Sequence, residues 1–141
     1  MTPPNVLDFA ALARMVVAPP FHRWLGLKLV ALDEDSVAIA MPWREEFVSD
    51  PRARYTHGGV IAALIDLSAD YAIAAKLGRG VPTVDMRVDF HAAAMPDETL
   101  TATARVIKLG RSLATAEARI AGRDGKLIAS GRGVYLTQPR D

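Results

Sequence analysis

Residues 58–77 have the sequence GGVIAALIDLSADYAIAAKL, which contains no proline and is followed by Gly78. Alanine and leucine are strong helix formers, and a lysine in the last turn followed by glycine is typical of a helix C-terminus. The sequence therefore predicts one long helix of about five turns. Because apolar residues cover nearly every face of this helix, we expect it to be buried in the core rather than to lie on the surface.

Stretches with the alternation of β-strands lie on both sides of this predicted helix. Before it, residues 25–41 form two alternating runs around the polar turn Asp33-Glu34-Asp35-Ser36, which predicts a hairpin, and the proline-interrupted residues 42–56 are expected to be a loop. After it come β-like runs at residues 84–91, 99–108, 112–121 and 126–137. Strands joined by hairpins make an antiparallel sheet. We therefore expect an α+β fold in which the sheet wraps around the one apolar helix.

The first 20 residues are predicted to add a short helical segment. Apolar residues between Val6 and Val17 recur at helical spacing, which predicts an amphipathic helix, and the pair Pro19-Pro20 interrupts the pattern. A chain of 141 residues, half of them hydrophobic, is long enough for one core. We therefore expect a single domain over residues 1–141, with residues 1–20 as its N-terminal helical segment.

Composition excludes several classes of function. Seventeen basic and sixteen acidic residues leave a net charge of +1 without a basic run, so nucleic acid is not an expected partner. No uncharged apolar run reaches the roughly 18 residues of a membrane helix, and the N-terminus lacks the pattern of a signal peptide. With no cysteine and only three histidines, neither a thiolate site nor a metal centre is expected, and the cytoplasm is the expected location.

The start of the long helix, His57-Gly58-Gly59, is a candidate binding site. The first turn of a helix offers unpaired N–H groups at the positive end of the helix dipole, and glycine allows another group to approach closely. Such a site suits an anion, or an oxygen that becomes negative in a transition state. The alternative is a glycine turn that merely lets the helix pack against a strand.

Two carboxylates, Asp66 and Asp70, interrupt the apolar helix. They are four residues apart, so they share one face and repel each other, and aspartate is a poor helix former. Burial raises a carboxylate pKa toward the range that suits a general base. The alternative is that one of the two lies at a solvent-facing end and pairs with a basic residue such as Arg52 or Arg54, which suits Asp70 better than Asp66.

The spacing of these residues has a consequence for assembly. Asp66 lies eight residues beyond Gly58, which is about 12 Å along one helix. A base and an oxyanion donor that act on one carbonyl must each come within about 3 Å of the reacting atoms. If both act, Asp66 of one subunit must face Gly58 of another, so we expect an oligomer with a two-fold axis.

The motif at 57–59, the carboxylate Asp66 and the strand Thr83-Val84-Asp85-Met86-Arg87-Val88-Asp89-Phe90 together resemble the PaaI-like branch of the hot-dog-fold acyl-CoA thioesterases. The likeness covers about residues 21–138. It implies a hot-dog fold, a homodimer with a continuous sheet, and pairing of dimers into a homotetramer. The implied reaction is hydrolysis of an acyl- or aryl-CoA thioester to the free acid and coenzyme A. Coenzyme A is then part of the substrate, and no cofactor is implied.

The resemblance also implies roles for single residues. The N–H of Gly58 would polarise the thioester carbonyl, with Gly59 beside it at the substrate. Asp66 of the partner subunit would act as general base or as nucleophile, Thr83 would orient the attacking water, and His57 would fix the helix start. The family commonly has Asn or Gln in the preceding loop, and this chain has neither. Asp50 is the nearest polar substitute, but an ionised carboxylate cannot donate a hydrogen bond.

Basic residues are expected at the mouth of the site for the phosphates of coenzyme A. Lys108, Arg111 and Ser112, at a turn between two late strands, are the candidates, with Arg87 and Arg123 behind them; the alternative is that these side chains are simply solvated. Leu64, Ile65 and Met15 could line a chamber for the acyl group, but the favoured interpretation is that they are core residues.

Two other functions stay open on the same fold. One is a non-catalytic acyl-CoA-binding protein, which the missing Asn or Gln before His57 favours. The other is a hydratase or dehydratase, which is less favoured because those relatives use a catalytic histidine and none of the three histidines lies within the long helix.

Overall fold

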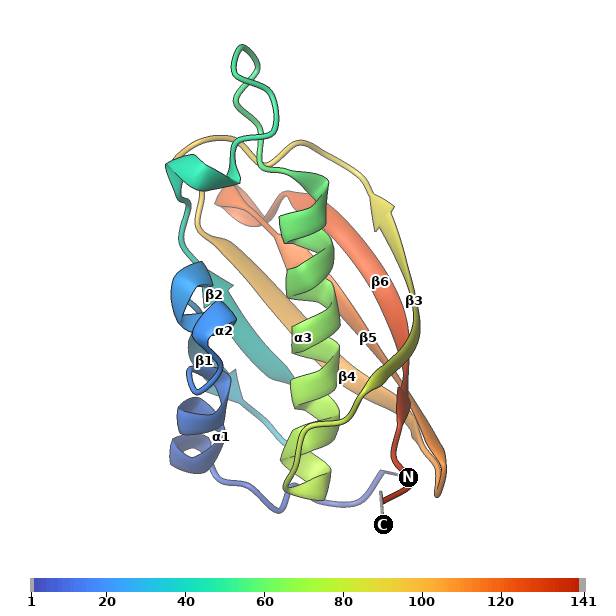
Figure 1. The fold of residues 1–141 in the computed structure, drawn as a ribbon. Coiled ribbons are helices and arrows are strands. Elements are labelled where there is room, and N and C mark those ends of the chain that lie inside the picture. Colours follow the sequence, from blue (N-terminus) through green and yellow to red (C-terminus); the bar gives the residue numbers. More distant parts are fainter. Residues whose placement is uncertain (1, 140–141) are drawn as a thin grey trace.

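The computed structural model describes residues 2–139 and contains one antiparallel sheet curled around one long helix (Figure 1). The sheet order is β1-β2-β4-β5-β6-β3, and every pairing is antiparallel. The strands are β1 (Lys28–Leu32), β2 (Val37–Met41), β3 (Thr83–Phe90), β4 (Leu100–Leu109), β5 (Leu113–Ala121) and β6 (Leu127–Leu136). The predicted α+β class, with a sheet that wraps a helix, is confirmed.

The central helix α3 spans Gly58–Leu77, as predicted. At its N-terminus the His57 side chain accepts a hydrogen bond from the Gly59 N–H, and at its C-terminus Gly78 adopts the left-handed conformation that ends many helices. Leu64 and Ile65 are fully buried in the core between helix and sheet. Burial, rather than amphipathic patterning, therefore stabilises this helix.

The strand β3 lies at an edge of the sheet and does not pair with β4, the next strand along the chain. After β2 the chain crosses the sheet as α3 and returns along the far edge, where β3 pairs with β6. Hairpins join β1 to β2, β4 to β5 and β5 to β6, so the expectation that hairpins join the strands fails only at β3. Within residues 2–139 nothing pairs with the outer edge of β3, and Val84 and Phe90 are exposed there.

The N-terminal segment contains two helices rather than one. The predicted helix is present as α1 (Phe9–Val16), capped by the Asp8 side chain, and a second helix, α2 (Pro20–Leu25), follows. The prediction treated the two prolines only as a stop signal, but Pro20 occupies the first helical position, where its fixed φ and missing N–H are tolerated. The first strand consequently begins at Lys28 and not at Leu25.

Short 3₁₀ helices interrupt two connections. One lies at Glu45–Phe47, inside the stretch predicted as loop, and the other lies at Arg123–Gly125, between β5 and β6. In the part of the chain that the structure describes, no helix is both long enough and apolar enough to cross a membrane.

Candidate active site

Asp66 on α3 is held by two hydroxyl groups. Thr83 Oγ1, at the start of β3, donates to Asp66 Oδ1 over 2.7 Å, so the structure brings these two predicted site residues together. Tyr135 on β6 donates to the same oxygen over 3.1 Å and to the Asp66 main-chain carbonyl over 2.9 Å. The other carboxylate oxygen, Oδ2, has no hydrogen-bond partner among residues 2–139.

Two glycines of β6 leave space on the face of the sheet that α3 covers: one for the side chain of Tyr135, and one for α3. A Cβ atom on Gly133 would lie 2.3 Å from the Tyr135 hydroxyl oxygen, so the tyrosine ring lies over that position. A Cβ atom on Gly131 would lie 2.7 Å from Ile65 Cγ2 of α3. The sequence analysis missed Tyr135. The signal that could have found it is Gly-Arg-Gly inside a strand, since glycine there marks a close approach.

Asp70, one helical turn beyond Asp66, has a different environment. Its Oδ1 accepts a hydrogen bond from the Val81 N–H over 3.0 Å, in the connection from α3 to β3. The pKa of Asp70 is raised to about 6, mainly by burial and to a smaller extent by the nearby charge of Asp66, while the Val81 hydrogen bond opposes this rise.

The predicted pairing of Asp70 with Arg52 or Arg54 is wrong. Arg54 instead pairs with Glu45 over 2.6 Å, in the loop before α3, and within residues 2–139 no ion pair involves Asp70. The reason is position: that loop adjoins the N-terminal end of α3, whereas Asp70 lies in its C-terminal half (Figure 1).

The start of α3 leaves one amide free. The His57 N–H donates to the Phe47 carbonyl over 2.7 Å, and His57 Nδ1 accepts from the Gly59 N–H over 2.8 Å. The Gly58 N–H has no acceptor in the described part of the chain. Of the two glycines, Gly58 therefore offers its N–H to a ligand while the N–H of Gly59 is occupied by the cap.

Gly58 also serves packing, as the alternative interpretation expected. A Cβ atom there would lie 3.3 Å from the ring of Phe90, the last residue of β3. Both interpretations of the glycine motif therefore apply to the same residue: it admits the ring of Phe90 and presents a free N–H.

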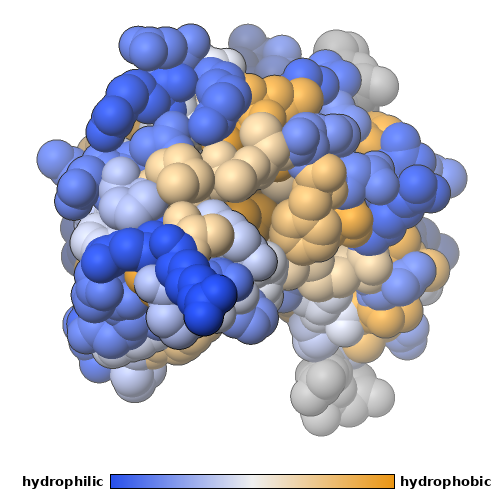
Figure 2. All heavy atoms as spheres, turned by 90° about the horizontal axis from the view of Figure 1, so that it is seen from above, coloured by the Kyte–Doolittle hydropathy of each residue, from blue (hydrophilic) through white to orange (hydrophobic). Residues whose placement is uncertain are grey.

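An apolar hollow of about 410 Å³ adjoins Gly58. Figure 2 looks down on this end of the molecule, where hydrophobic surface surrounds a depression in the centre and hydrophilic side chains surround the hydrophobic surface. Leu64 and Ile65 are core residues, as the favoured interpretation expected, and neither they nor Met15 line this hollow. The lining residues are Tyr55, Thr56, Gly58, Ile61, Phe90, His91, Ala92, Ala93 and Ala94.

Asp50 lies in the loop that projects beyond the N-terminal end of α3 (Figure 1). One of its carboxylate oxygens accepts hydrogen bonds from the N–H groups of Ala53, over 2.9 Å, and Arg52, over 2.7 Å. These two hydrogen bonds hold the pKa of Asp50 below its usual value. The side chain is thus an ionised acceptor that closes a turn of its own loop.

The turn between β4 and β5 lies at the opposite end of α3 from Gly58 (Figure 1). The carbonyl of Ser112 in this turn accepts from the Thr137 N–H, and Arg79, just after α3, donates to the Thr137 carbonyl. The predicted phosphate-binding residues Lys108, Arg111 and Ser112 are therefore brought together with one another, but not with Gly58 of the same chain.

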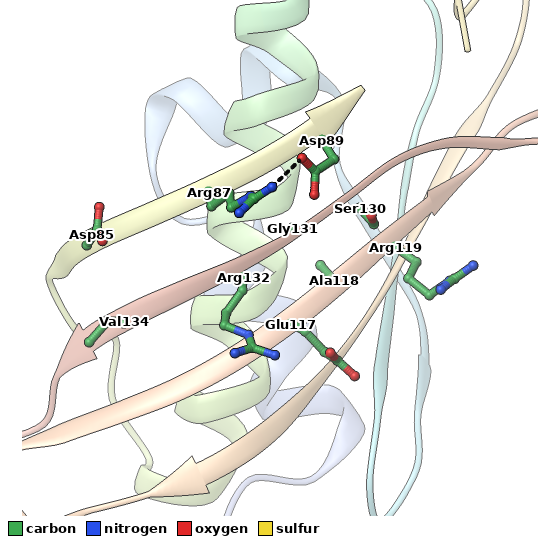
Figure 3. A pocket seen from close by; sticks show the side chains of 10 residues that line it. All are labelled: Asp85, Arg87, Asp89, Glu117, Ala118, Arg119, Ser130, Gly131, Arg132 and Val134. Carbon is green, nitrogen blue, oxygen red and sulfur yellow. Dashed lines mark hydrogen bonds and ion pairs between the residues drawn. The ribbon is translucent and has the colours of Figure 1, made fainter. Parts of the chain in front are cut away.

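A second hollow, of about 480 Å³, lies on the outer face of the sheet, away from α3 (Figure 3). Its walls carry both signs of charge, and Arg87 pairs there with Asp89 over 3.4 Å. Arg87 thus lies on the other face of the sheet from Asp66 and Thr83.

Arg123, the other basic residue considered for the phosphates of coenzyme A, donates to the Asp97 carbonyl in a connection between strands.

Gly58 and Asp66 lie on one continuous helix, eight residues and about 12 Å apart. Within one chain the free N–H and the held carboxylate therefore do not reach a common carbonyl group.

An antiparallel sheet curled around a central helix is the hot-dog fold, and the carboxylate and free amide on that helix are what the resemblance to hot-dog thioesterases led us to expect. A family model, the thioesterase superfamily, matches residues 54–129. The chain belongs to this superfamily and is a thioester hydrolase by class, which confirms the predicted family.

Named relatives cover most of the chain. Acyl-coenzyme A thioesterase 13 of Mus musculus is 37% identical over 122 residues, covering 84% of this chain and 85% of that protein. The medium/long-chain acyl-CoA thioesterase YigI of Escherichia coli is 26% identical over 133 residues, covering 83% and 84%. An X-ray structure of a thioesterase superfamily protein is 46% identical, with a TM-score of 0.87, and the match covers 90% of this chain and 96% of that one.

Proposed function

We propose that the protein hydrolyses acyl-CoA thioesters in sites that each combine Gly58 of one subunit with Asp66 and Thr83 of its partner. The observation that carries the proposal lies on α3. Among residues 2–139, the Gly58 N–H at its start has no acceptor, and about 12 Å further on Asp66 has one carboxylate oxygen without a partner. The acyl-CoA thioesterases among the relatives support the substrate class.

The chemistry follows from these two groups. The thioester oxygen accepts a hydrogen bond from the Gly58 N–H, and the helix dipole stabilises the charge that develops on it. Asp66 Oδ2 accepts a proton from water while the water oxygen bonds to the thioester carbon. The C–S bond then breaks, and the proton passes to the leaving thiolate, which gives the acid and coenzyme A without a further cofactor. Attack by Asp66 itself, through an acyl anhydride, is the alternative route.

The outer edge of β3 is the surface through which we propose that two chains pair. Val84 and Phe90 are exposed there, and the main-chain groups of this edge have no strand partner in the described part of the chain. This edge therefore suits addition of a second β3 strand, which would make one continuous sheet. Antiparallel pairing sets the two α3 helices in opposite directions, so that the partner's Lys108, Arg111 and Ser112 approach Gly58 and can bind the phosphates of coenzyme A. Pairing of such dimers into tetramers, and a cytoplasmic location, stay predictions from the sequence.

The test removes the two proposed catalytic groups separately, first the Gly58 N–H and then the Asp66 carboxylate. Gly58→Pro deletes the N–H at a position where proline is favoured, after a residue whose extended backbone (φ −58°, ψ 133°) suits a following proline. Gly58→Ala is the matched control, since it adds a Cβ near Phe90 but keeps the N–H. We expect kcat on a panel of acyl- and aryl-CoA esters to fall by about 100-fold or more in Gly58→Pro and far less in Gly58→Ala.

Asp66→Asn tests the proposed base in the same assay. It keeps the size of the side chain and removes the base, so we expect a loss of about 1,000-fold with the assembly intact. Unchanged turnover in Asp66→Asn, or equal turnover in the two Gly58 variants, would reject the proposed site.

A non-catalytic acyl-CoA-binding protein is the second candidate function. The observation that favours it is Asp50, whose ionised carboxylate is engaged within its own loop where the family commonly has an amide side chain. Calorimetry on the wild-type protein separates the two functions, because this candidate requires binding of an acyl-CoA without release of coenzyme A. A hydratase is less favoured, since none of the three histidines lies within α3.

A further inference from the structure

The two hydroxyl groups on Asp66 come from facing positions of two strands. Thr83 on β3 and Tyr135 on β6 are directly opposite each other in the antiparallel register, and both side chains point toward α3. They donate to the same carboxylate oxygen, Oδ1, over 2.7 Å and 3.1 Å. A pair of strands thus presents two hydroxyl donors side by side to one oxygen of the helix.

Tyr135 does more than add a second hydrogen bond. Its hydroxyl lies 2.9 Å from the main-chain carbonyl of Asp66 as well as near Oδ1, so it joins the main chain and the side chain of one residue. Tyr135 is fully buried, packed among Ala69, Ile73 and Val81, and its ring lies in the space left by Gly133. A rigid ring with one hydroxyl position therefore fixes how the Asp66 carboxylate is turned.

Both donors leave Oδ2 without a partner in residues 2–139. An oxygen that already accepts two hydrogen bonds has little capacity for a third, whereas Oδ2 can accept a proton from water. Burial and the charge of Asp66 raise the pKa of Tyr135 above its usual value, which keeps the phenol a donor across the neutral range.

We infer that Tyr135 is a positioning residue for thioester hydrolysis: it fixes the Asp66 carboxylate so that Oδ2 is the oxygen that accepts the proton of the attacking water. This inference rests on the proposed function. Tyr135 acts through Asp66 and does not touch the substrate.

The test is Tyr135→Phe, which removes the hydroxyl and keeps the ring over Gly133. With the carboxylate free to rotate, we expect kcat to fall about 10- to 100-fold, because misplacement of a reacting group lowers the rate without weakening binding. KM should stay within about twofold of the wild type, since the substrate pocket is unchanged.

Tyr71→Phe is the matched control. Tyr71 is another buried tyrosine, on α3 itself, and donates to the Met15 carbonyl over 3.0 Å at a position away from the hydroxyl pair on Asp66. Both variants lose a buried phenol hydrogen bond, so we expect similar drops in melting temperature, with kcat lowered only in Tyr135→Phe. Equal effects of the two variants on kcat would overturn the inference, because they would show a purely structural role.

Asp66→Asn is measured in the same series to separate the two proposals. If Asp66→Asn is inactive while Tyr135→Phe turns over like the wild type, the inference is overturned and the proposed function stands. If Asp66→Asn turns over like the wild type, the proposed base is wrong, and the role given to Tyr135 is overturned with it.

Discussion

Asp70 is a half-buried carboxylate that accepts a hydrogen bond from a main-chain N–H, and within residues 2–139 no ion pair involves it. Burial raises its pKa from 3.8 to about 6 in the folded protein. Between these two values the folded state binds more protons than the unfolded state, so folding is favoured at low pH. The stability that this residue contributes is complete below pH 3.8 and is lost as the pH rises through about 6.

Asp70→Asn is therefore expected to stabilise the protein at pH 8. Asparagine keeps an oxygen that accepts from the Val81 N–H and removes the charge whose burial is unfavourable. We expect the free energy of unfolding to rise by up to about 3 kcal/mol at pH 8, and the gain to vanish near pH 4. Urea unfolding of both proteins across this pH range measures the difference. A gain of the same size at both ends of the range would contradict this explanation.

Single residues were predictable from sequence where they broke a local rule. Asp66 stood out because a carboxylate is unfavourable inside an apolar helix, and Gly58 because glycine is unfavourable in a helix without a reason. Tyr135 itself breaks no rule in a strand, and the Gly-Arg-Gly before it indicates a close approach without showing which residue approaches. Its role depends on the register that sets it opposite Thr83, which no local pattern contains. The partner of Asp70 was mispredicted for the same reason, since it lies in a turn whose path only the fold determines.

At the scale of elements, the cap of α3 can be tested on its own. The His57 side chain accepts from the Gly59 N–H at the helix start. His57→Ala leaves that N–H without a partner, and we expect a loss of about 1 kcal/mol in the free energy of unfolding. His57→Asn supplies another capping oxygen and should recover most of the loss. Urea unfolding at one pH checks both, and equal losses in the two variants would show that the cap contributes little.

Most elements were predicted within a few residues of their bounds. Alternation and helical spacing are local properties, and they were sufficient for α3, for α1 and for the six strands. Two features were not local. The helix α2 begins at Pro20, and proline is favoured at the first position of a helix but disrupts a helix in its interior. The place of β3 beside β6 depends on α3 crossing the whole sheet before the chain returns.

At the scale of the whole molecule, the proposed sharing of each site between two subunits predicts complementation between inactive variants. Gly58→Pro and Asp66→Asn should each retain about 1% or less of the wild-type activity as a pure protein. In a mixed dimer one site carries both changes and the other site carries none. Random mixing makes about half of the dimers mixed, so about a quarter of the wild-type activity should return.

The experiment unfolds and refolds the two variants together and assays them beside each one alone. No return of activity, with mixed dimers verified by a mass-labelled subunit, would contradict a site built from two chains. The requirement for two chains stays an expectation from the spacing of Gly58 and Asp66 along one helix, which could be worked out from the sequence because the rise per residue is independent of tertiary packing.

The close approach of Tyr135 to Gly133 also limits how this sequence can vary. A methyl group at position 133 would overlap the tyrosine ring, with its nearest atom at 2.3 Å, so the two positions cannot change independently. Relatives with alanine or a larger residue at position 133 are expected to have a residue smaller than tyrosine at position 135, and relatives that keep this tyrosine should keep the glycine. The pair therefore provides a covariation signal that can be read from an alignment, before any variant is made.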